Sequence, residues 1–211
     1  MIVAIDGPAA AGKGTLARRI ADALGFAHLD TGALYRAVGL GVLRAGHDPA
    51  DEKAALAIAM ALDPADLSDP ALREEETGKA ASVVSVHPAV RAALLNFQRN
   101  FARSPPNGAA GAVVEGRDIG TVVCPDAAVK LFIDADLEVR AKRRLAELLA
   151  QDPSQTLDAV RAEMAARDER DRNRADSPLE AAPDAHLLDT TDLDIDGAFD
   201  AAMKVIGGAE K

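Results

Sequence analysis

The segment AIDGPAAAGKGTL at residues 4–16 restricts the fold of this chain more than any other part of the sequence. It joins a short apolar run, Ile2–Ile5, to a segment, Leu16–Leu24, in which apolar residues recur at helical spacing. Gly7–Gly14 fits the pattern G-x-x-x-x-G-K, in which a glycine-rich turn between a buried strand and a helix presents backbone N–H groups to phosphates. The segment therefore predicts a strand, a phosphate loop and a helix at the start of an α/β domain.

The lysine of this loop favours a bound anion over a purely structural turn. The alternative is that the glycines only permit a tight connection between strand and helix. Lys13 would then stand at a helix N-terminus, where the helix dipole disfavours a cation. We therefore expect the loop to bind a nucleoside triphosphate such as ATP. The candidate ATP-binding residues are Gly7, Pro8, Ala9, Ala10, Ala11, Gly12, Lys13, Gly14 and Thr15.

The two residues after the lysine indicate which class of enzyme this phosphate loop belongs to. Gly14 occupies the position that usually carries Ser or Thr, and the hydroxyl follows one residue later at Thr15. The sequence GKGT is typical of small nucleoside monophosphate kinases. Thr15 is the candidate metal contact.

Strand and helix patterns alternate along the rest of the chain. FAHL, AVVE, VKLFID and AHLLDT read as strands, and the helices between them are expected to be capped by Asp30 or Thr31, by Asp136 and by Ser154. This alternation predicts a doubly wound, mostly parallel sheet flanked by helices. Residues 61–79 are rich in Asp, Pro and Glu, and we expect them to form an irregular excursion outside the core, a hinge or a small lobe.

Composition excludes several classes of partner. The formal net charge is −10 and aromatic residues make up 3% of the chain, which argues against a nucleic-acid surface. Cys124 is the single cysteine, so no internal disulfide can form, and no Cys or His cluster has zinc spacing. The start MIVAI lacks a basic segment, and no apolar run approaches the roughly 20 residues of a membrane span. We expect a cytoplasmic monomer that binds neither nucleic acid nor membrane.

The distribution of arginines favours phosphoryl transfer to an acceptor. The N/TKxD motif with which regulatory GTPases read their base is absent. An acceptor that itself carries a phosphate needs positive charge opposite the loop, because the reaction brings two anionic groups together. Candidate arginines are Arg36 in DTGALYR, Arg91 on a helical pattern and Arg117 in VEGRD.

A further group of arginines lies in RDERDRNR. Arg167, Asp171 and Arg174 have the spacing i, i+4, i+7 and should share one helical face, with Arg170 and Arg172 pointing elsewhere. A solvated helix end with surface salt bridges is the alternative. Together with the phosphate loop, the segment indicates a mobile lid.

The chain resembles the bacterial cytidylate kinases nearly from end to end. The resemblance is carried by IDGPAAAGKGTLA, LDTGALYRA, VEGRDIGTVVCPDA, RDERDRNRADSPL and DAHLLDTTDL. It implies transfer of the γ-phosphoryl group of ATP to CMP or dCMP with Mg²⁺. It also implies one phosphate-loop kinase domain over residues 1–211, with an acceptor-binding lobe at 59–103 and a lid at 150–176. Relatives usually carry a three-stranded insertion in this lobe, which residues 61–79 are too short to hold, and the family pattern resumes near Arg73.

The resemblance also assigns roles to residues. Lys13, Arg117, Arg167 and Arg174 would be catalytic. The acceptor site would comprise Thr31, Arg36, Ser82, Arg91, Arg117, Asp118, Arg167, Asp171 and Arg174. Within it Arg36 and Arg117 hold the phosphate, Asp171 lies toward the ribose, and Ser82, Arg91 and Asp118 read the cytosine.

The base-reading assignment agrees with the chemistry of cytosine. A carboxylate at Asp118 can accept a hydrogen bond from N4, while Arg91 donates to N3 and O2, and uracil reverses the pattern. The alternatives are an Asp118 that caps a turn and an Arg91 that is solvated on its helix. Two other functions stay open at this point: a different monophosphate kinase of the same fold, and a nucleotide-sensing module that has lost transfer.

Overall fold

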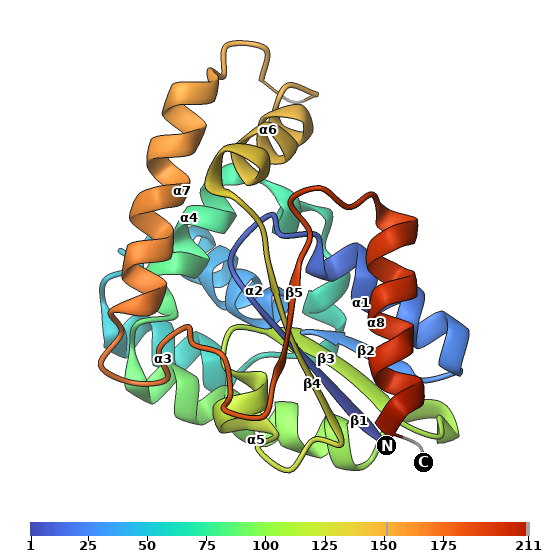
Figure 1. Cartoon of the computed structure of the whole chain (residues 1–211). Coiled ribbons are helices and arrows are strands. Elements are labelled where there is room, and N and C mark those ends of the chain that lie inside the picture. The colour runs from blue at the N-terminus through green and yellow to red at the C-terminus, as the bar shows by residue number, and fades with distance from the viewer. Residues whose placement is uncertain (151, 210–211) are drawn as a thin grey trace. The chain divides into compact units, whose positions relative to one another are not determined.

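The computed structural model describes residues 1–150 and 152–209, and its internal contacts divide the chain into two units. The first unit comprises Met1–His28 and Pro105–Lys211, and the second comprises Leu29–Ser104 (Figure 1). Gln151, which belongs to the expected lid, and residues 210–211 lie outside the described residues.

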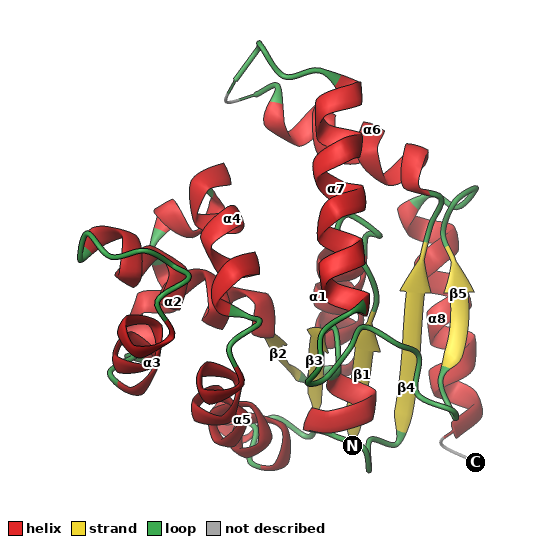
Figure 2. Cartoon of the chain, turned by 90° about the vertical axis from the view of Figure 1, so that its left-hand side faces the viewer, coloured by secondary structure: helices red, strands yellow, loops and turns green. Residues whose placement is uncertain are grey.

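A parallel sheet forms the centre of the first unit. Its strands are β1 (Ile2–Asp6), β2 (Ala27–Asp30), β3 (Ala112–Gly116), β4 (Val129–Asp134) and β5 (His186–Asp189), in the order β2-β3-β1-β4-β5 (Figure 2). β1 runs parallel to β3 and β4, with Val3 opposite both Val113 and Val129, and β4 runs parallel to β5. The doubly wound α/β fold expected from the sequence is confirmed.

Helices connect the strands of this unit. They are α1 (Lys13–Leu24), the short η3 (Pro106–Gly108), a π-helical turn η4 (Ile119–Val123), α6 (Leu137–Leu148), α7 (Leu157–Arg172) and α8 (Ile195–Ala209). Leu16 and Ile20 of α1 pack with Ile206 of α8 against the central strands. Because helices cover the sheet, β1 and β3 are continuously apolar apart from their last residues. Asp6 and Glu115 stand at those ends, where the loops begin.

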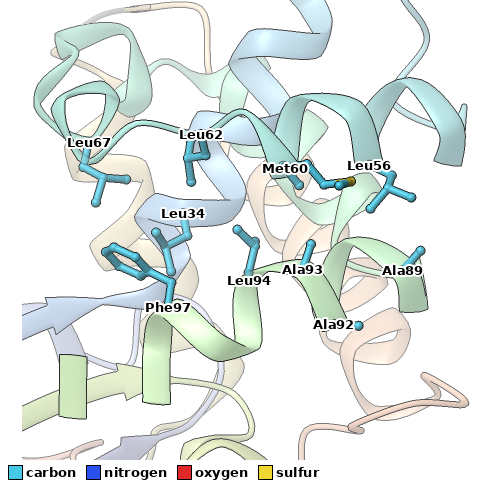
Figure 3. Close-up of a pocket in the computed structure, with 11 residues that line it drawn as sticks. Leu34, Leu56, Met60, Leu62, Leu67, Ala89, Ala92, Ala93, Leu94 and Phe97 are labelled. Carbon is cyan, nitrogen blue, oxygen red and sulfur yellow. The ribbon is translucent and has the colours of Figure 1, made fainter. Parts of the chain in front are cut away.

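The second unit is helical beyond the last residues of β2. It contains α2 (Thr31–Arg44), α3 (Glu52–Met60), the 3₁₀ helices η1 (Pro64–Ser68) and η2 (Pro70–Arg73), α4 (Glu75–Val84) and α5 (Pro88–Arg103). Leu34, Val38, Val84, Val90 and Leu94 are among its buried core residues. Between α3 and α5 lies an apolar pocket of about 630 Å³, into which Leu34, Leu62 and Phe97 point (Figure 3).

The expected helix caps are partly right. Asp30 caps α2 by accepting a hydrogen bond from the Ala33 backbone N–H at 3.2 Å, and Asp136 caps α6 through Glu138 at 2.7 Å. The assignment of Ser154 as a cap is wrong, because α7 begins later, at Leu157, and Thr156 caps it. Ser154 instead donates its hydroxyl to Asp152 at 2.7 Å.

The stretch at residues 61–79 is more ordered than its composition suggests. It holds η1, η2 and the start of α4. Leu72 is buried against Ala37 and Leu40 of α2, and Thr77 is also buried. The expectation of an excursion outside the core is therefore wrong for these two residues, whereas Arg73 is exposed.

Over the described residues, no single helix is long and apolar enough to cross a membrane. The bent pair Glu75–Val84 and Pro88–Gly108 meets the length and composition criteria only when its two helices are taken together.

Candidate active site

The loop between β1 and α1 has the backbone that its glycines require. Gly7 has φ 144°, and a Cβ atom there would collide with the backbone carbonyl of Ile133, so the position accepts no side chain. Gly12 has φ 88° and is also left-handed. Ala10 has φ 57°, a conformation that costs a residue with a side chain roughly 1–2 kcal/mol. The loop is thus held in a shape that an extended or helical segment would not adopt.

Lys13 is the first residue of α1 and is buried. Its Nζ donates a hydrogen bond to the carbonyl oxygen of Pro8, inside the loop. Burial first and the nearby Arg117 second lower the pKa of Lys13, Glu115 and Asp6 act in the opposite direction, and the net result is a pKa of about 7. An anion in the loop would restore the charged lysine, which agrees with the interpretation of the sequence.

Three arginines of the first unit gather around Asp171; we call Arg117, Arg167 and Arg174 the arginine cluster. Arg117 Nε donates to Asp171 Oδ2 at 3.0 Å, and Arg174 Nη2 donates to Asp171 Oδ1 at 2.9 Å. Burial alone would raise the pKa of Asp171, but the arginine cluster outweighs it and holds that pKa below its ordinary value. The cluster keeps net positive charge next to one carboxylate and can bind an anion.

Arg174 joins this cluster from the segment after α7, and not from the helix itself as the sequence predicted. α7 ends at Arg172, so the expected single helical face is correct for Arg167 and Asp171 and wrong for Arg174. The carbonyl of Asp171 accepts from the Leu179 N–H at 2.8 Å instead of continuing the helix. Pro178 lies between the end of α7 and Leu179, and a proline disfavours helical backbone at the residue before it. Arg170 and Arg172 are exposed, as expected.

Asp118 lies directly after Arg117, at the start of η4, and is buried. Its carbonyl accepts the Val122 N–H at 2.9 Å, but its side chain makes no capping hydrogen bond. The alternative that the carboxylate serves to cap the turn is therefore not supported.

The remaining candidate residues belong to the second unit. Arg36 forms an ion pair with Asp30, Nη2 to Oδ2 at 2.6 Å. A Cβ atom on Gly32 would lie 3.0 Å from Arg36 Nη1, so the glycine leaves room for the guanidinium. Thr31 is buried at the start of α2.

Arg91 is buried on α5, and the alternative of a solvated side chain is wrong. Its Nη1 donates to the Ser85 carbonyl at 3.3 Å, and its guanidinium lies 5.6 Å from the ring centre of Tyr35. Ser82 is buried on α4 in the same unit. Thr31, Arg36, Ser82 and Arg91 therefore share the second unit, while Lys13, Asp118, Asp171 and the arginine cluster share the first.

A metal ion would find few protein ligands here. No group of three or more His, Cys, Asp or Glu side chains within residues 1–150 and 152–209 could hold one. Thr15 is exposed on the first turn of α1, so its hydroxyl is accessible to a hydrated ion. This donor set suits Mg²⁺, which usually keeps several waters and binds substrate phosphates.

Three buried polar residues near the loop escaped the sequence interpretation. Asp6 accepts two backbone hydrogen bonds, Glu115 lies 2.9 Å from His28 Nε2, and Arg140 pairs with Asp168 at 2.8 Å. A signal existed for two of them: a carboxylate at the end of an apolar strand, directly before the glycine loop or before VEGRD, is placed at the sheet edge where sites form.

The family model for cytidylate kinase matches residues 3–207. The chain belongs to the cytidylate kinase family. It is 57% identical over 206 residues to the cytidylate kinase of Rhodospirillum rubrum, and 59% identical over 206 residues to that of Paramagnetospirillum magneticum. Each alignment covers 98% of this chain and 97% of the relative. The resemblance found in the sequence is thereby confirmed.

Solved structures of lower similarity support the fold. An uncharacterized protein from Eubacterium ventriosum matches with a TM-score of 0.56 at 16% identity, covering 98% of both chains. A sugar kinase from Janibacter sp. matches with a TM-score of 0.50 at 14% identity, covering 98% of this chain and 94% of its own.

Proposed function

We propose that this cytidylate kinase family member transfers the γ-phosphoryl group of ATP to CMP or dCMP, giving ADP and CDP or dCDP, in pyrimidine nucleotide metabolism. The observation that carries the proposal is the buried Lys13 in a loop of restricted backbone, within the same unit as the arginine cluster. A donor loop and an anion-binding cluster in one unit are what transfer between two phosphates needs.

The reaction requires no protein base. The second pKa of a phosphate monoester is about 6, so the attacking oxygen of CMP is largely ionised at neutral pH. Lys13 and the loop N–H groups neutralise the transferred phosphoryl group, and Arg36 and Arg117 hold the acceptor phosphate. Arg167 and Arg174 stabilise the charge that develops between the two.

Mg²⁺ accompanies ATP in this proposal. Thr15 is the residue that contacts it, with the remaining positions taken by nucleotide phosphates and water. When bound, the ion supplies further charge neutralisation on the donor phosphates. Within the described residues no group of three or more His, Cys, Asp or Glu side chains could hold a metal, which fits an ion held mainly by its substrate.

Base recognition is assigned to buried groups. Asp118 accepts from cytosine N4, Arg91 donates to N3 and O2, and Ser82 adds a hydroxyl. Asp171 lies toward the ribose, and Thr31 belongs to the same CMP-binding set. The burial of Asp118 and Arg91 supports this assignment, because an unpaired buried polar group costs about 1–3 kcal/mol with the wrong base. Residues 59–103 act as the acceptor-binding lobe and 150–176 as the lid. The protein works as a cytoplasmic monomer whose partners are these nucleotides.

An ADP-release assay with ATP and Mg²⁺ tests the proposal, with CMP, dCMP, UMP, AMP, GMP or no acceptor. We expect turnover with CMP and dCMP well above that with the others. Faster turnover with another monophosphate would assign the chain to a different acceptor. ATP binding without acceptor-dependent ADP would instead indicate a nucleotide-sensing module.

A further inference from the structure

We propose that Asp6 is a positioning residue, which holds the turn that carries Arg117 and Asp118 in fixed register with the phosphate loop. Its Oδ1 accepts the Ile119 backbone N–H at 2.8 Å, and its Oδ2 accepts the Gly120 N–H at 2.7 Å. The inference rests on the proposed function, because it concerns how the acceptor residues of that reaction are placed.

Asp6 stands in the chain next to the phosphate loop, so its two hydrogen bonds connect that loop to the turn after Asp118. Asp6 directly precedes Gly7, the first residue of the loop, and Ile119 directly follows Asp118. One side chain therefore joins the backbone that binds the donor to the backbone that presents the acceptor groups. The two N–H groups belong to the first residues of η4, where a helical turn leaves its donors without intrahelical partners.

A carboxylate suits this task better than a neutral side chain. Asp6 is 4% exposed, and burying a charge is costly unless it is well hydrogen-bonded. Both oxygens accept here, so each lost hydrogen bond would leave a buried group unsatisfied. An asparagine keeps the size but turns an N–H₂ group toward one of the two donors, which removes half of the contact.

Gly120 allows the close approach. A Cβ atom at this position would lie 3.4 Å from Asp6 Oδ2 and 3.2 Å from the Cδ atom of Lys130. The peptide thus fits between the carboxylate and the lysine stem, while the Lys130 ammonium itself pairs with Asp184 at 2.8 Å. These neighbours leave little room for Gly120 to move toward either side chain.

The surroundings of Asp6 give it a pKa within the pH range in which enzyme kinetics can be measured. Burial raises the pKa of Asp6 to about 6; the two backbone N–H groups act against this, Asp118 raises it and Lys13 lowers it. The charged groups that face it are Lys13 from α1, Asp118 from the turn and, beside Gly120, Lys130 from β4. Protonation of Asp6 removes one of its two acceptor functions.

Kinetics of the Asp6→Asn variant test the inference. We expect kcat/KM for CMP to fall about tenfold at pH 8, with KM for ATP changed less than about twofold. The ratio of wild-type to variant kcat/KM cancels the titration of CMP itself, since both enzymes use the same substrate. This ratio should fall about threefold between pH 8 and pH 5.5, because about three quarters of Asp6 is protonated at the lower pH and then resembles the variant.

Three results would overturn the inference: an unchanged kcat/KM, a ratio that does not depend on pH, or a KM for ATP that rises as much as that for CMP. If the variant does not fold, the amide proton shifts of Ile119 and Gly120 in the wild-type protein provide the test. They should titrate together with a midpoint near pH 6, and shifts that stay constant over this range would refute the contact. A wild-type protein without kinase activity refutes the proposed function instead, and the amide titration still decides on Asp6.

Discussion

Arg117 donates a hydrogen bond from Nε to Oδ2 of Asp171 over 3.0 Å, which joins the turn after β3 to the last turn of α7. The same carboxylate binds Arg174 through its other oxygen. Asp171 is thus the counter-ion that keeps two arginines of the cluster close together. A substrate phosphate that enters the cluster meets guanidinium groups already brought together, which lowers the entropic cost of binding.

Replacing Asp171 should weaken catalysis through the arginines that it holds. We expect Asp171→Asn to lower kcat/KM for CMP about tenfold or more, since an amide oxygen is a weaker acceptor and carries no charge. Arg170→Gln, on an exposed position of the same helix, is the matched control and should leave the kinetics unchanged. Steady-state kinetics with varied CMP measure both, and an Asp171→Asn enzyme with wild-type kcat/KM would contradict the role of the cluster.

The same carboxylate should make stability depend on pH. The pKa of Asp171 is below its ordinary value of 3.8 in the folded chain because the arginines outweigh burial. A depressed folded pKa gives a stabilisation that is fully present above pH 3.8 and is lost as the pH falls through the folded value. Urea unfolding should therefore show wild type more stable than Asp171→Asn at pH 7, by about 3 kcal/mol. The difference should shrink below pH 3.8, and one that stays constant would be inconsistent with this sign.

Lys13 is expected to reduce stability while it serves function. Burial and Arg117 both disfavour its charge. Lys13→Met should therefore abolish detectable phosphoryl transfer but leave the Tm without ligand unchanged or higher. Lys142→Met, an exposed lysine on α6, is the control and should keep activity. A large drop in Tm for Lys13→Met would show that the lysine is structural.

The fold could be predicted from sequence because strong local signals and tertiary packing agree. The apolar strand before GPAAAGKGT fixed β1, the loop and α1, and the alternation of strands and helices fixed the parallel sheet. The end of α7 could not be predicted in this way. Helical spacing continues through Arg174, but the turn is decided by a hydrogen bond from Leu179, which is a contact made only in the folded chain.

The candidate site could be predicted only in part: residues whose type alone indicates phosphate binding, such as lysine and arginine, could be found from the sequence. Lys13 and the arginines near the phosphate loop were found, but Asp6 and the pair Arg140–Asp168 were not. Asp6 had a signal in its place at the end of an apolar strand, but its hydrogen bonds to the Ile119 and Gly120 N–H groups, and the pairing of Arg140 with Asp168, join segments far apart in the chain. Burial also decided between alternatives that sequence left open, as for Arg91. Periodicity assigns apolar residues to the buried side of a helix, and it gives no direct indication that an arginine on the same helix is buried as well.

Asp118 should determine which pyrimidine is accepted. A carboxylate accepts from cytosine N4 but faces the acceptor O4 of uracil, so Asp118→Asn should narrow the preference for CMP over UMP by about tenfold to a hundredfold. Asp126→Asn, on an exposed residue eight positions later, is the control and should keep the wild-type preference. Competition between CMP and UMP at limiting ATP measures the ratio directly. An unchanged ratio in Asp118→Asn would remove this residue from base recognition.

Arg140 and Asp168 form a buried pair, and we expect replacement of Arg140 to lower the free energy of unfolding more than replacement of Asp168. Arg140 Nη2 lies 2.8 Å from Asp168 Oδ2, and Arg140 also donates to the Ala135 and Ala9 carbonyls, at 2.8 Å and 3.3 Å. Arg140→Met strands a buried carboxylate and releases the phosphate loop at Ala9, so we expect a loss of about 3–5 kcal/mol of unfolding free energy and a higher KM for ATP.

Asp168→Asn should cost less. The amide oxygen still accepts from Arg140, and the Oδ1 atom of Asp168 is buried without a hydrogen bond to any residue that the structure describes, so its charge is poorly compensated. We expect a loss of about 1–2 kcal/mol and an unchanged KM for ATP, because Arg140 keeps its contact with the loop. Urea unfolding and kinetics with varied ATP measure both variants. Equal losses would mean that the pair acts as a unit in stability, and a raised KM for ATP in Asp168→Asn would mean that α7, through Asp168, sets the position of Arg140 at the loop.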